Sequence, residues 1–485
     1  MRAVILTATI SVIAAIGLIV AAVSFDADGN TYRNESMNPE LSSFEEDTYV
    51  VWSESINSEF FDVYFTKITN SASIGDTLNI TQGTSFYPRA QVLASESNVY
   101  VLWEDRTTPD GDDGIFFKKS NDGGKTFGDT KTFDYINDSG RFPYRPITMM
   151  ESAGILYVFM SGASHQASEN RIVFVTSADG GNTFGKPEQF FQFDGGVEYM
   201  NVISADDIIY AVSSERHHHF DESGSMGFRK ITDGNTSDVI NIAKTGYFVN
   251  SLRLAASDDN VYIITVELAD EWQDDGLIKE KQTLFFTSSN DGGNTFEESK
   301  RMNIDPKSNG VENQGIQIFS YDDFVYVMWE EDYTDGYGNI HRKTWFAKSD
   351  DHGKTFDVVA VHPLDELRSK YGHVYAHEEN NGLYFVVTSE VGHFNEDVTI
   401  FFASSSNDDK GDMLELPEIV DVIGESLPTF DAPKTVIHEN NVQIIGDVML
   451  GGNCILYVSS SDGGESFSDP INLSPNGIIE DCIIQ

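Results

Sequence analysis

A short segment that recurs five times constrains the fold of this chain more than any other feature. Every copy follows the pattern S-x-D-x-G-x-T-F, except that the fifth has Ser in place of Thr. Repetition at this level indicates a fold built from repeated units, because chance does not produce five near-identical copies in one chain. We call this segment the box. Its copies are Ser120–Phe127, Ser177–Phe184, Ser289–Phe296, Ser349–Phe356 and Ser460–Phe467.

The spacing of the boxes predicts the size and number of the units. Neighbouring box aspartates are 57 or 60 residues apart, or 112 and 111 residues apart, which corresponds to two units. Each long gap has a degenerate copy at its middle, and a third degenerate copy lies one unit before the first box. These copies are Thr232–Asn235, Asn407–Asp409 and Phe65–Lys67. We therefore expect eight units of about 57 residues, or seven if the first and last share one unit.

Each unit has the pattern of four β-strands, A to D, with the box as the turn between C and D. In the second unit the expected strands are 89–94, 99–104, 115–120 and 131–135. Apolar and aromatic runs bounded by turn residues recur at the same places in the other units. Four-stranded sheets at a fixed period are typical of a propeller. We predict an all-β fold in which residues 25–485 form a β-propeller of four-stranded antiparallel blades, eight or seven in number.

The residue types of the box predict a structural role. The aspartate can accept hydrogen bonds from backbone N–H groups of the turn, and glycine supplies the positive φ that the turn needs. The phenylalanine is expected to be buried beside the neighbouring sheet. We expect the five box aspartates to hold the turns rather than a ligand; they are Asp122, Asp179, Asp291, Asp351 and Asp462.

The box resembles the Asp-box, or bacterial neuraminidase repeat, of the sialidase superfamily. That resemblance covers residues 40–485 and implies a propeller, with a sialidase-type glycoside hydrolase as one functional reading. Sialidases bind the sialate carboxylate with three arginines, and the candidates on expected inner strands are Arg89, Arg145 and Arg253. The early Arg-Ile-Pro motif of the family is missing. Tyr87–Arg89 and Tyr144–Pro146 are the nearest strings, both in a different order.

The N-terminus predicts export. Arg2 is followed by Ala3–Val23, which contains no charged residue. A basic start, an apolar run and small residues at 22–24 are typical of a signal peptide. The run is also about long enough to span a bilayer. Residues 1–24 are therefore expected to be a signal peptide or an uncleaved N-terminal membrane anchor, and the protein is expected to be secreted or at the cell surface.

Net charge restricts the partners. With 78 acidic against 31 basic residues, the formal charge is −47, and so strong a negative charge repels nucleic acid and anionic membranes. A glycan or protein ligand is expected on the B–C loops, because long loops on a rigid scaffold concentrate binding. Those loops are 105–114, 161–171, 215–227, 268–282, 331–343 and 390–397. A ring of acids is expected beside them, at Glu54, Glu104, Glu215, Glu267, Glu330 and Glu390.

Histidines and cysteines supply two further predictions. Imidazole and carboxylate are ligands for copper or zinc, so a divalent cation is a candidate ligand of the loop face; no other cofactor is indicated. The histidines chosen for that site are His217, His219, His373 and His377. Cys454 and Cys482 are expected to form a disulfide if the chain is exported, because oxidising compartments preserve such bonds.

Two functions follow as expectations. The first is a secreted or cell-surface, non-catalytic recognition propeller for a glycan, protein or cell-envelope ligand. The alternative is an exo-sialidase-like glycoside hydrolase. The two differ in whether three arginines and a Tyr–Glu pair converge at the centre of the ring.

Overall fold

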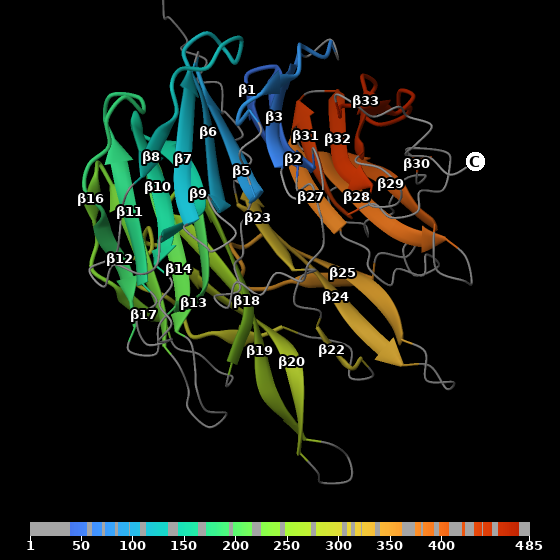
Figure 1. Cartoon of the computed structure of the whole chain (residues 1–485). Coiled ribbons are helices and arrows are strands. Elements are labelled where there is room, and N and C mark those ends of the chain that lie inside the picture. Colours follow the sequence, from blue (N-terminus) through green and yellow to red (C-terminus); the bar gives the residue numbers. More distant parts are fainter. Residues whose placement is uncertain are drawn as a thin grey trace, which may run out of the picture.

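The computed structural model places β-strands in eight sheets that follow one another in chain order (Figure 1). It describes residues 39–55, 61–69, 73–82, 86–96, 98–106, 113–133, 144–162, 171–193, 197–215, 225–242, 248–272, 278–302, 308–311, 316–321, 323–334, 340–360, 374–379, 382–391, 397–406, 420–421, 431–438, 440–448 and 454–474. Within these ranges, no helix has the length and apolar character needed to cross a membrane.

The first four sheets take up residues 40 to 242. Sheet 1 contains β1 (Glu40–Phe44), β2 (Asp47–Ser55), β3 (Phe61–Ile68) and β4 (Leu78–Asn79). Sheet 2 contains β5 (Phe86–Ser95), β6 (Asn98–Arg106), β7 (Asp113–Ser120) and β8 (Lys131–Phe133). Sheet 3 contains β9 (Tyr144–Ser152), β10 (Ile155–Gly162), β11 (Arg171–Ser177) and β12 (Glu188–Gln192). Sheet 4 contains β13 (Val197–Ala205), β14 (Ile208–Glu215), β15 (Met226–Thr232), β16 (Asn235–Thr236) and β17 (Ile240–Ile242).

The last four sheets take up residues 248 to 472. Sheet 5 contains β18 (Phe248–Ser257), β19 (Asn260–Trp272), β20 (Ile278–Ser289) and β21 (Lys300–Arg301). Sheet 6 contains β22 (Gly310–Val311), β23 (Gln317–Tyr321), β24 (Phe324–Thr334), β25 (Ile340–Ser349) and β26 (Asp357–Ala360). Sheet 7 contains β27 (Val374–Glu379), β28 (Gly382–Val391), β29 (Asp397–Ser406) and β30 (Val420–Asp421). Sheet 8 contains β31 (Asp431–His438), β32 (Asn441–Val448), β33 (Cys454–Ser460) and β34 (Ile471–Asn472).

The sheets are arranged as the blades of a propeller. Innermost strands of consecutive sheets contact one another from β1 through β5, β9, β13, β18, β23 and β27 to β31, and β31 contacts β1. Every strand pairing is antiparallel, and Figure 1 shows the red strands of sheet 8 beside the blue strands of sheet 1. Sheets 1 and 8 are each complete within their own segment, so no strand is shared where the ring closes.

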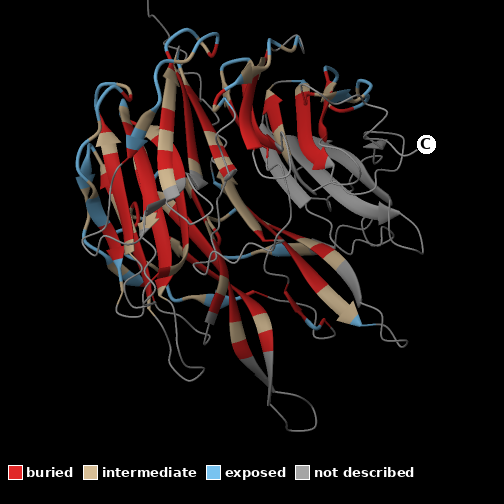
Figure 2. Cartoon of the chain, in the orientation of Figure 1, coloured by how far each residue is buried: buried red, intermediate tan, exposed pale blue. Residues whose placement is uncertain are grey.

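Central strands with described side chains are packed on both faces, which explains the continuous apolar runs in the sequence. In β6, Val101 and Trp103 pack against sheet 1, whereas Tyr100 and Leu102 pack against sheet 3. Alternate side chains of a strand point to opposite faces, so a strand between two neighbours needs apolar residues at every position. Figure 2 accordingly shows the central strands as almost wholly buried.

The interface between sheets 8 and 1, which we call the seam, closes the ring without a shared strand among the described residues. Its apolar cluster joins Trp52, Tyr64 and Leu41 of sheet 1 to the core of sheet 8. At the innermost strands, Lys434 Nζ lies 3.3 Å from Glu40 Oε1. The sheet 8 members of the cluster are Val436, Ile445, Ile455, Tyr457 and Leu473.

Two predicted loops differ from expectation. Residues 268–282 and 331–343 were expected as B–C loops, but β19 continues to Trp272 and β24 to Thr334 before their partner strands begin at Ile278 and Ile340. Both hairpins are extended ribbons, because polar and charged residues form β-ladders as readily as apolar ones once the first pairs have fixed the register. The degenerate box at 232–235 is a tight turn, with Asp233 and Gly234 at φ 50° and 75°. The one at 407–409 lies outside the described residues.

Candidate functional site

The box is a hydrogen-bonded turn at one end of the five sheets that contain it, and we call this end the box end. In sheet 5, Asp291 Oδ1 accepts from Ser289 Oγ (2.7 Å) and from the backbone N–H of Thr295 (2.9 Å), and Asp291 Oδ2 accepts from Thr295 Oγ1 (2.7 Å). Ser289 Oγ in turn accepts from the N–H of Gly293 (2.9 Å). The same bonds recur in the other four boxes.

These bonds lower the pKa of the box carboxyls. The Thr295 hydroxyl is the main cause for Asp291, whose pKa falls to about 2, as does that of Asp122 through Thr126. For Asp462 the Ser460 hydroxyl contributes most and the pKa is about 2. The pKa of Asp179 is lowered further, chiefly by Thr183. In Asp351, burial raises the pKa, but bonds from Thr355 and Ser349 outweigh it and bring it to about 2.

The carboxylates themselves are at the surface, and the buried part of the box is its serine and its second glycine. Gly293 has φ 78°, and a Cβ there would lie 2.4 Å from a ring carbon of Phe228 in sheet 4. Phe296 of the same box packs edge-on against Phe228, with ring centroids 4.9 Å apart. This box thus joins its sheet to the preceding one, and three other boxes make the same contact. Equivalent pairs are Phe127 with Phe65, Phe184 with Phe117, and Phe356 with Phe286.

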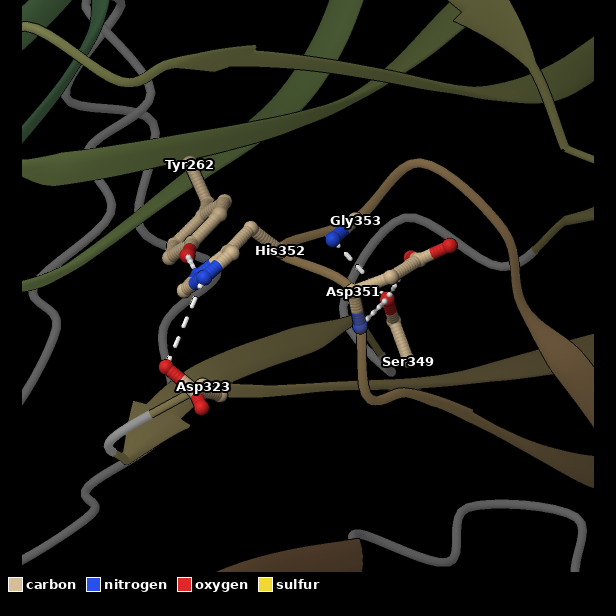
Figure 3. Close-up of polar contacts among 6 residues, drawn as sticks. All are labelled: Tyr262, Asp323, Ser349, Asp351, His352 and Gly353. Atoms are coloured by element: carbon tan, nitrogen blue, oxygen red, sulfur yellow. Dashed lines mark hydrogen bonds and ion pairs between the residues drawn. The ribbon is translucent and has the colours of Figure 1, made fainter.

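The box of sheet 6 differs from the others, because His352 stands where they have glycine (Figure 3). Its Nδ1 lies 3.4 Å from the Tyr262 hydroxyl of sheet 5, and its Nε2 lies 3.4 Å from Asp323 Oδ1. Between sheets 4 and 5, Lys230 Nζ instead donates to the Gly292 carbonyl at 2.7 Å. His352 therefore makes a contact between sheets 5 and 6, whereas a lysine makes the corresponding contact between sheets 4 and 5. Sequence reasoning missed it, although its box is the one with His at this position.

The opposite end of each sheet, where strand B passes to strand C, is called the B–C end. Three of the acids that we expected beside the B–C loops are buried instead of exposed. Glu54, Glu267 and Glu330 are 4%, 1% and 1% exposed. They lie between sheets, because alternation turns them toward a neighbour rather than toward solvent. Glu215 accepts from Ser225 Oγ at 2.5 Å. The side chain of Glu390 lies outside the described residues.

The three candidate arginines lie on innermost strands, on β5, β9 and β18. Arg89 Nε is 3.8 Å from Glu104 Oε1 of the neighbouring strand. Arg253 Nη1 donates to the Leu252 carbonyl (2.8 Å) and to Ser251 Oγ (3.2 Å) of its own strand. The side chain of Arg145 lies outside the described residues. Arg89 and Arg253 thus each make contacts within their own sheet, and β18 belongs to a sheet that does not adjoin the other two.

A cluster of polar side chains lies at the B–C end of sheet 6, on the extended ribbon of β24 and β25. Glu331 is fully buried; its Oε1 accepts from Trp329 Nε1 (2.8 Å) and its Oε2 accepts from the Tyr333 hydroxyl (3.0 Å). Lys343 stands opposite Glu331 in the ladder, and its Nζ lies 5.2 Å from the centre of the Tyr333 ring. Tyr333 is half-buried. A phenol, an amine and a buried carboxylate therefore lie together at this end.

Sequence reasoning placed binding on the segment 331–343 but did not select Tyr333 or Lys343. The available signal was the spacing Trp-x-Glu-x-Tyr at 329–333, since residues two apart on a strand share one face.

The predicted metal and disulfide residues are mostly outside the described residues. Four of them lie wholly outside the described residues: His217, His219, His373 and Cys482. Of His377, which belongs to β27, only the backbone is described. In the described parts of the chain, no group of three or more His, Cys, Asp or Glu side chains is placed to hold a metal ion. Cys454 is buried at the start of β33. Its pairing with Cys482 stays a prediction, as does the divalent cation.

Comparisons with known proteins concern the fold. No model of a known family matches the chain, and no curated protein sequence matches it. The polysaccharide lyase Uly1 is similar in structure, with a TM-score of 0.48 and 11% identity over 93% of this chain and 98% of that one. An ulvan lyase of family PL25 has a TM-score of 0.46 and 12% identity, over 79% and 93%. The β-propeller domain of the Trilobed protease from Pyrococcus furiosus has a TM-score of 0.39 and 10% identity, over 81% and 99%.

The resemblance of the boxes to those of sialidases therefore rests on the motif itself.

Proposed function

We propose that the chain is an exported, non-catalytic binding propeller that recognises a glycan at the B–C end of sheets 5 and 6. The observation that carries this proposal is Tyr333, a half-buried ring whose hydroxyl is fixed by the buried Glu331. Aromatic rings with a few fixed polar groups are the usual composition of a small-molecule site. Sugars suit it, because their C–H faces stack on rings and their hydroxyls bond to amines and carboxylates.

The two ends of the propeller differ in what they leave available. At the box end, the aspartates, hydroxyls and turn N–H groups bond to one another. At the B–C end, the β19–β20 and β24–β25 ribbons extend beyond the other strands (Figure 1). A net charge of −47 favours a neutral or amino-bearing glycan over an anionic one. The sialidase-like alternative receives less support, since Arg89 and Arg253 make contacts within their own sheets.

The test is glycan binding by the purified protein, measured by a glycan array and then by calorimetry. Tyr333→Ala and Lys343→Ala are expected to weaken binding roughly tenfold or more, as removal of a stacking ring or a charged donor does. Lys348→Ala is the matched control: it lies on the same strand, over the rings of Phe324 and Tyr326, but at the box end.

Equal loss of binding in the control, or full binding in Tyr333→Ala, would contradict this location. Hydrolysis of a fluorogenic sialoside that depends on Arg89 or Arg253 would favour the alternative function.

A further inference from the structure

The pair Trp-x-Glu occurs in two sheets with the same internal contact. Trp52 Nε1 donates to Glu54 Oε2 at 3.3 Å, and Trp329 Nε1 donates to Glu331 Oε1 at 2.8 Å. Both carboxylates are buried, at 4% and 0% exposed. The two glutamates thus share the bond from the tryptophan, and Glu331 has a further bond from Tyr333 of its own strand.

The residue across the ladder differs in charge. Lys343 stands opposite Glu331, whereas Asp62 stands opposite Glu54. Side chains directly opposite each other in an antiparallel pair have Cβ atoms about 5 Å apart. Asp62 is 3% exposed and accepts from Asn79 Nδ2 (2.6 Å) and Thr81 Oγ1 (2.9 Å). Two carboxyl groups directly opposite each other repel when both are ionised, so a proton on Glu54 relieves the repulsion.

This acid pair lies in the seam. Trp52 and Tyr64, on the same face of sheet 1 as Glu54 and Asp62, belong to the apolar cluster shared with sheet 8. Ser474, which follows β34 of sheet 8, is a hydrogen-bond partner of Glu54. The seam also contains Asp447, which is 2% exposed and stands opposite the cluster residue Ile455.

Two further buried acids, Asp62 and Asp447, share the seam with Glu54. Asp62 comes from β3 and Asp447 from β32, and the ionisable Tyr64 lies next to Asp62 along β3. The seam's ion pair, Lys434 with Glu40, is on the innermost strands. Burial is the main reason why the pKa of Glu54 is raised, and the bonds from Trp52 and Ser474 oppose that change only in part.

We propose that the seam is a pH-controlled closure of the ring: sheets 1 and 8 are held together while Glu54 is protonated, and its deprotonation loosens them. The sign follows from linkage. A group whose pKa is higher in the folded than in the unfolded chain contributes stability that is complete below the unfolded value, 4.5, and is lost as the pH rises through the folded value. Among the described residues, no strand is shared between sheets 1 and 8, so loosening the seam breaks none of the ladders described above.

The experiment is hydrogen exchange of the full chain, read by mass spectrometry and corrected for intrinsic rates. As the pH is raised from 4.5, exchange in 40–55 and 454–474 is expected to rise, by up to tenfold for each pH unit above the folded pKa of Glu54. Peptides of the sheet 4–5 interface are expected to stay protected. Glu54→Gln keeps a side chain that can accept from Trp52 but cannot ionise, so it should abolish the rise.

Two further variants make the result decisive. Asp62→Asn removes the other acid of the pair and should also reduce the rise in exchange with pH. This variant still tests the proposal if Glu54→Gln does not fold. Glu331→Gln is the matched control, since its partner across the ladder is a lysine; it should leave the response of the seam unchanged. The proposal is overturned if neither seam variant alters the response, or if exchange rises equally in all eight sheets.

Discussion

The interface between sheets 4 and 5 and the seam between sheets 8 and 1 place their polar groups at opposite ends. Between sheets 4 and 5, a box contributes Gly293 and Phe296 against Phe228 and leaves an ionised Asp291 near the surface. At the seam, sheet 1 has no box, and the polar groups are buried carboxylates at the B–C end.

The two interfaces should therefore respond to pH in opposite directions. Box carboxyls have lowered pKa values, whereas the pKa of Glu54 is raised. A propeller with both kinds of interface is expected to be most stable at mildly acidic pH, where the box carboxylates are ionised and Glu54 is still protonated.

The largest effect is expected from acid, because it acts on five boxes at once. The box carboxyls have pKa values near 2 when folded and about 3.9 when unfolded. The unfolded chain therefore takes up protons first as the pH falls, and stability drops between about pH 4 and pH 2. Thermal unfolding followed by circular dichroism should show a steep fall in Tm in this range. A Tm that is constant from pH 5 to pH 2 would contradict it.

Removal of the largest seam side chain is expected to come next. Trp52 is fully buried and stacks on Tyr64 with ring centroids 5.9 Å apart. Trp52→Ala should lower the free energy of unfolding by about 3–5 kcal/mol, as other aromatic truncations in cores do. Phe228→Ala at the boxed interface is the counterpart. Both variants are measured by denaturant unfolding. If Phe228→Ala lowers the free energy of unfolding and Trp52→Ala does not, the apolar cluster does not hold the seam together.

A methyl group at the box glycine tests the close approach between sheets. Gly293→Ala would place a Cβ 2.4 Å from the Phe228 ring at a positive φ and should cost about 2–4 kcal/mol, from overpacking and from the left-handed backbone. Gly463→Ala is the control, because it has φ 75° and no atom within 4 Å of the new Cβ. It should cost only the backbone share, about 1–2 kcal/mol. Equal costs in chemical denaturation would mean that the aromatic contact is unimportant.

The smallest effect is expected from one box carboxylate. Asp351 accepts from Thr355 and Ser349 but is not buried, so Asp351→Ala should cost about 1 kcal/mol, the net value of surface-accessible hydrogen bonds. The adjacent, exposed Asp350 is the control, and Asp350→Ala should be close to neutral. A cost of several kcal/mol for Asp351→Ala would instead indicate a buried hydrogen-bond network.

Much of the fold could be predicted from the sequence. The expected strands of the second unit, 89–94 and 99–104, lie within β5 and β6. The box carries its contacts within eight residues, so the bonds from Thr295 to Asp291 follow from local geometry. The strands of the described residues form eight sheets, whereas the spacing predicted eight units or seven.

The candidate site could be predicted only as a region. The segment 331–343 was expected to bind a ligand, but its residues were expected in a loop, where the positions of Tyr333 and Lys343 would have no fixed relation. Their proximity depends on the register of the β24–β25 ladder, which places Lys343 opposite Glu331. Register depends on the whole hairpin and on the sheets that pack against it.

Sequence alone determined that this protein is a ring of four-stranded units joined by boxes, because those signals repeat over short distances. Only the tertiary structure decided which acids are buried and what faces them. Glu54 and Glu331 have the same local motif, but one stands opposite an aspartate in the seam and the other opposite a lysine. The physical reason is that the environment of a buried charge is set by neighbouring strands and sheets, which a local sequence pattern does not specify.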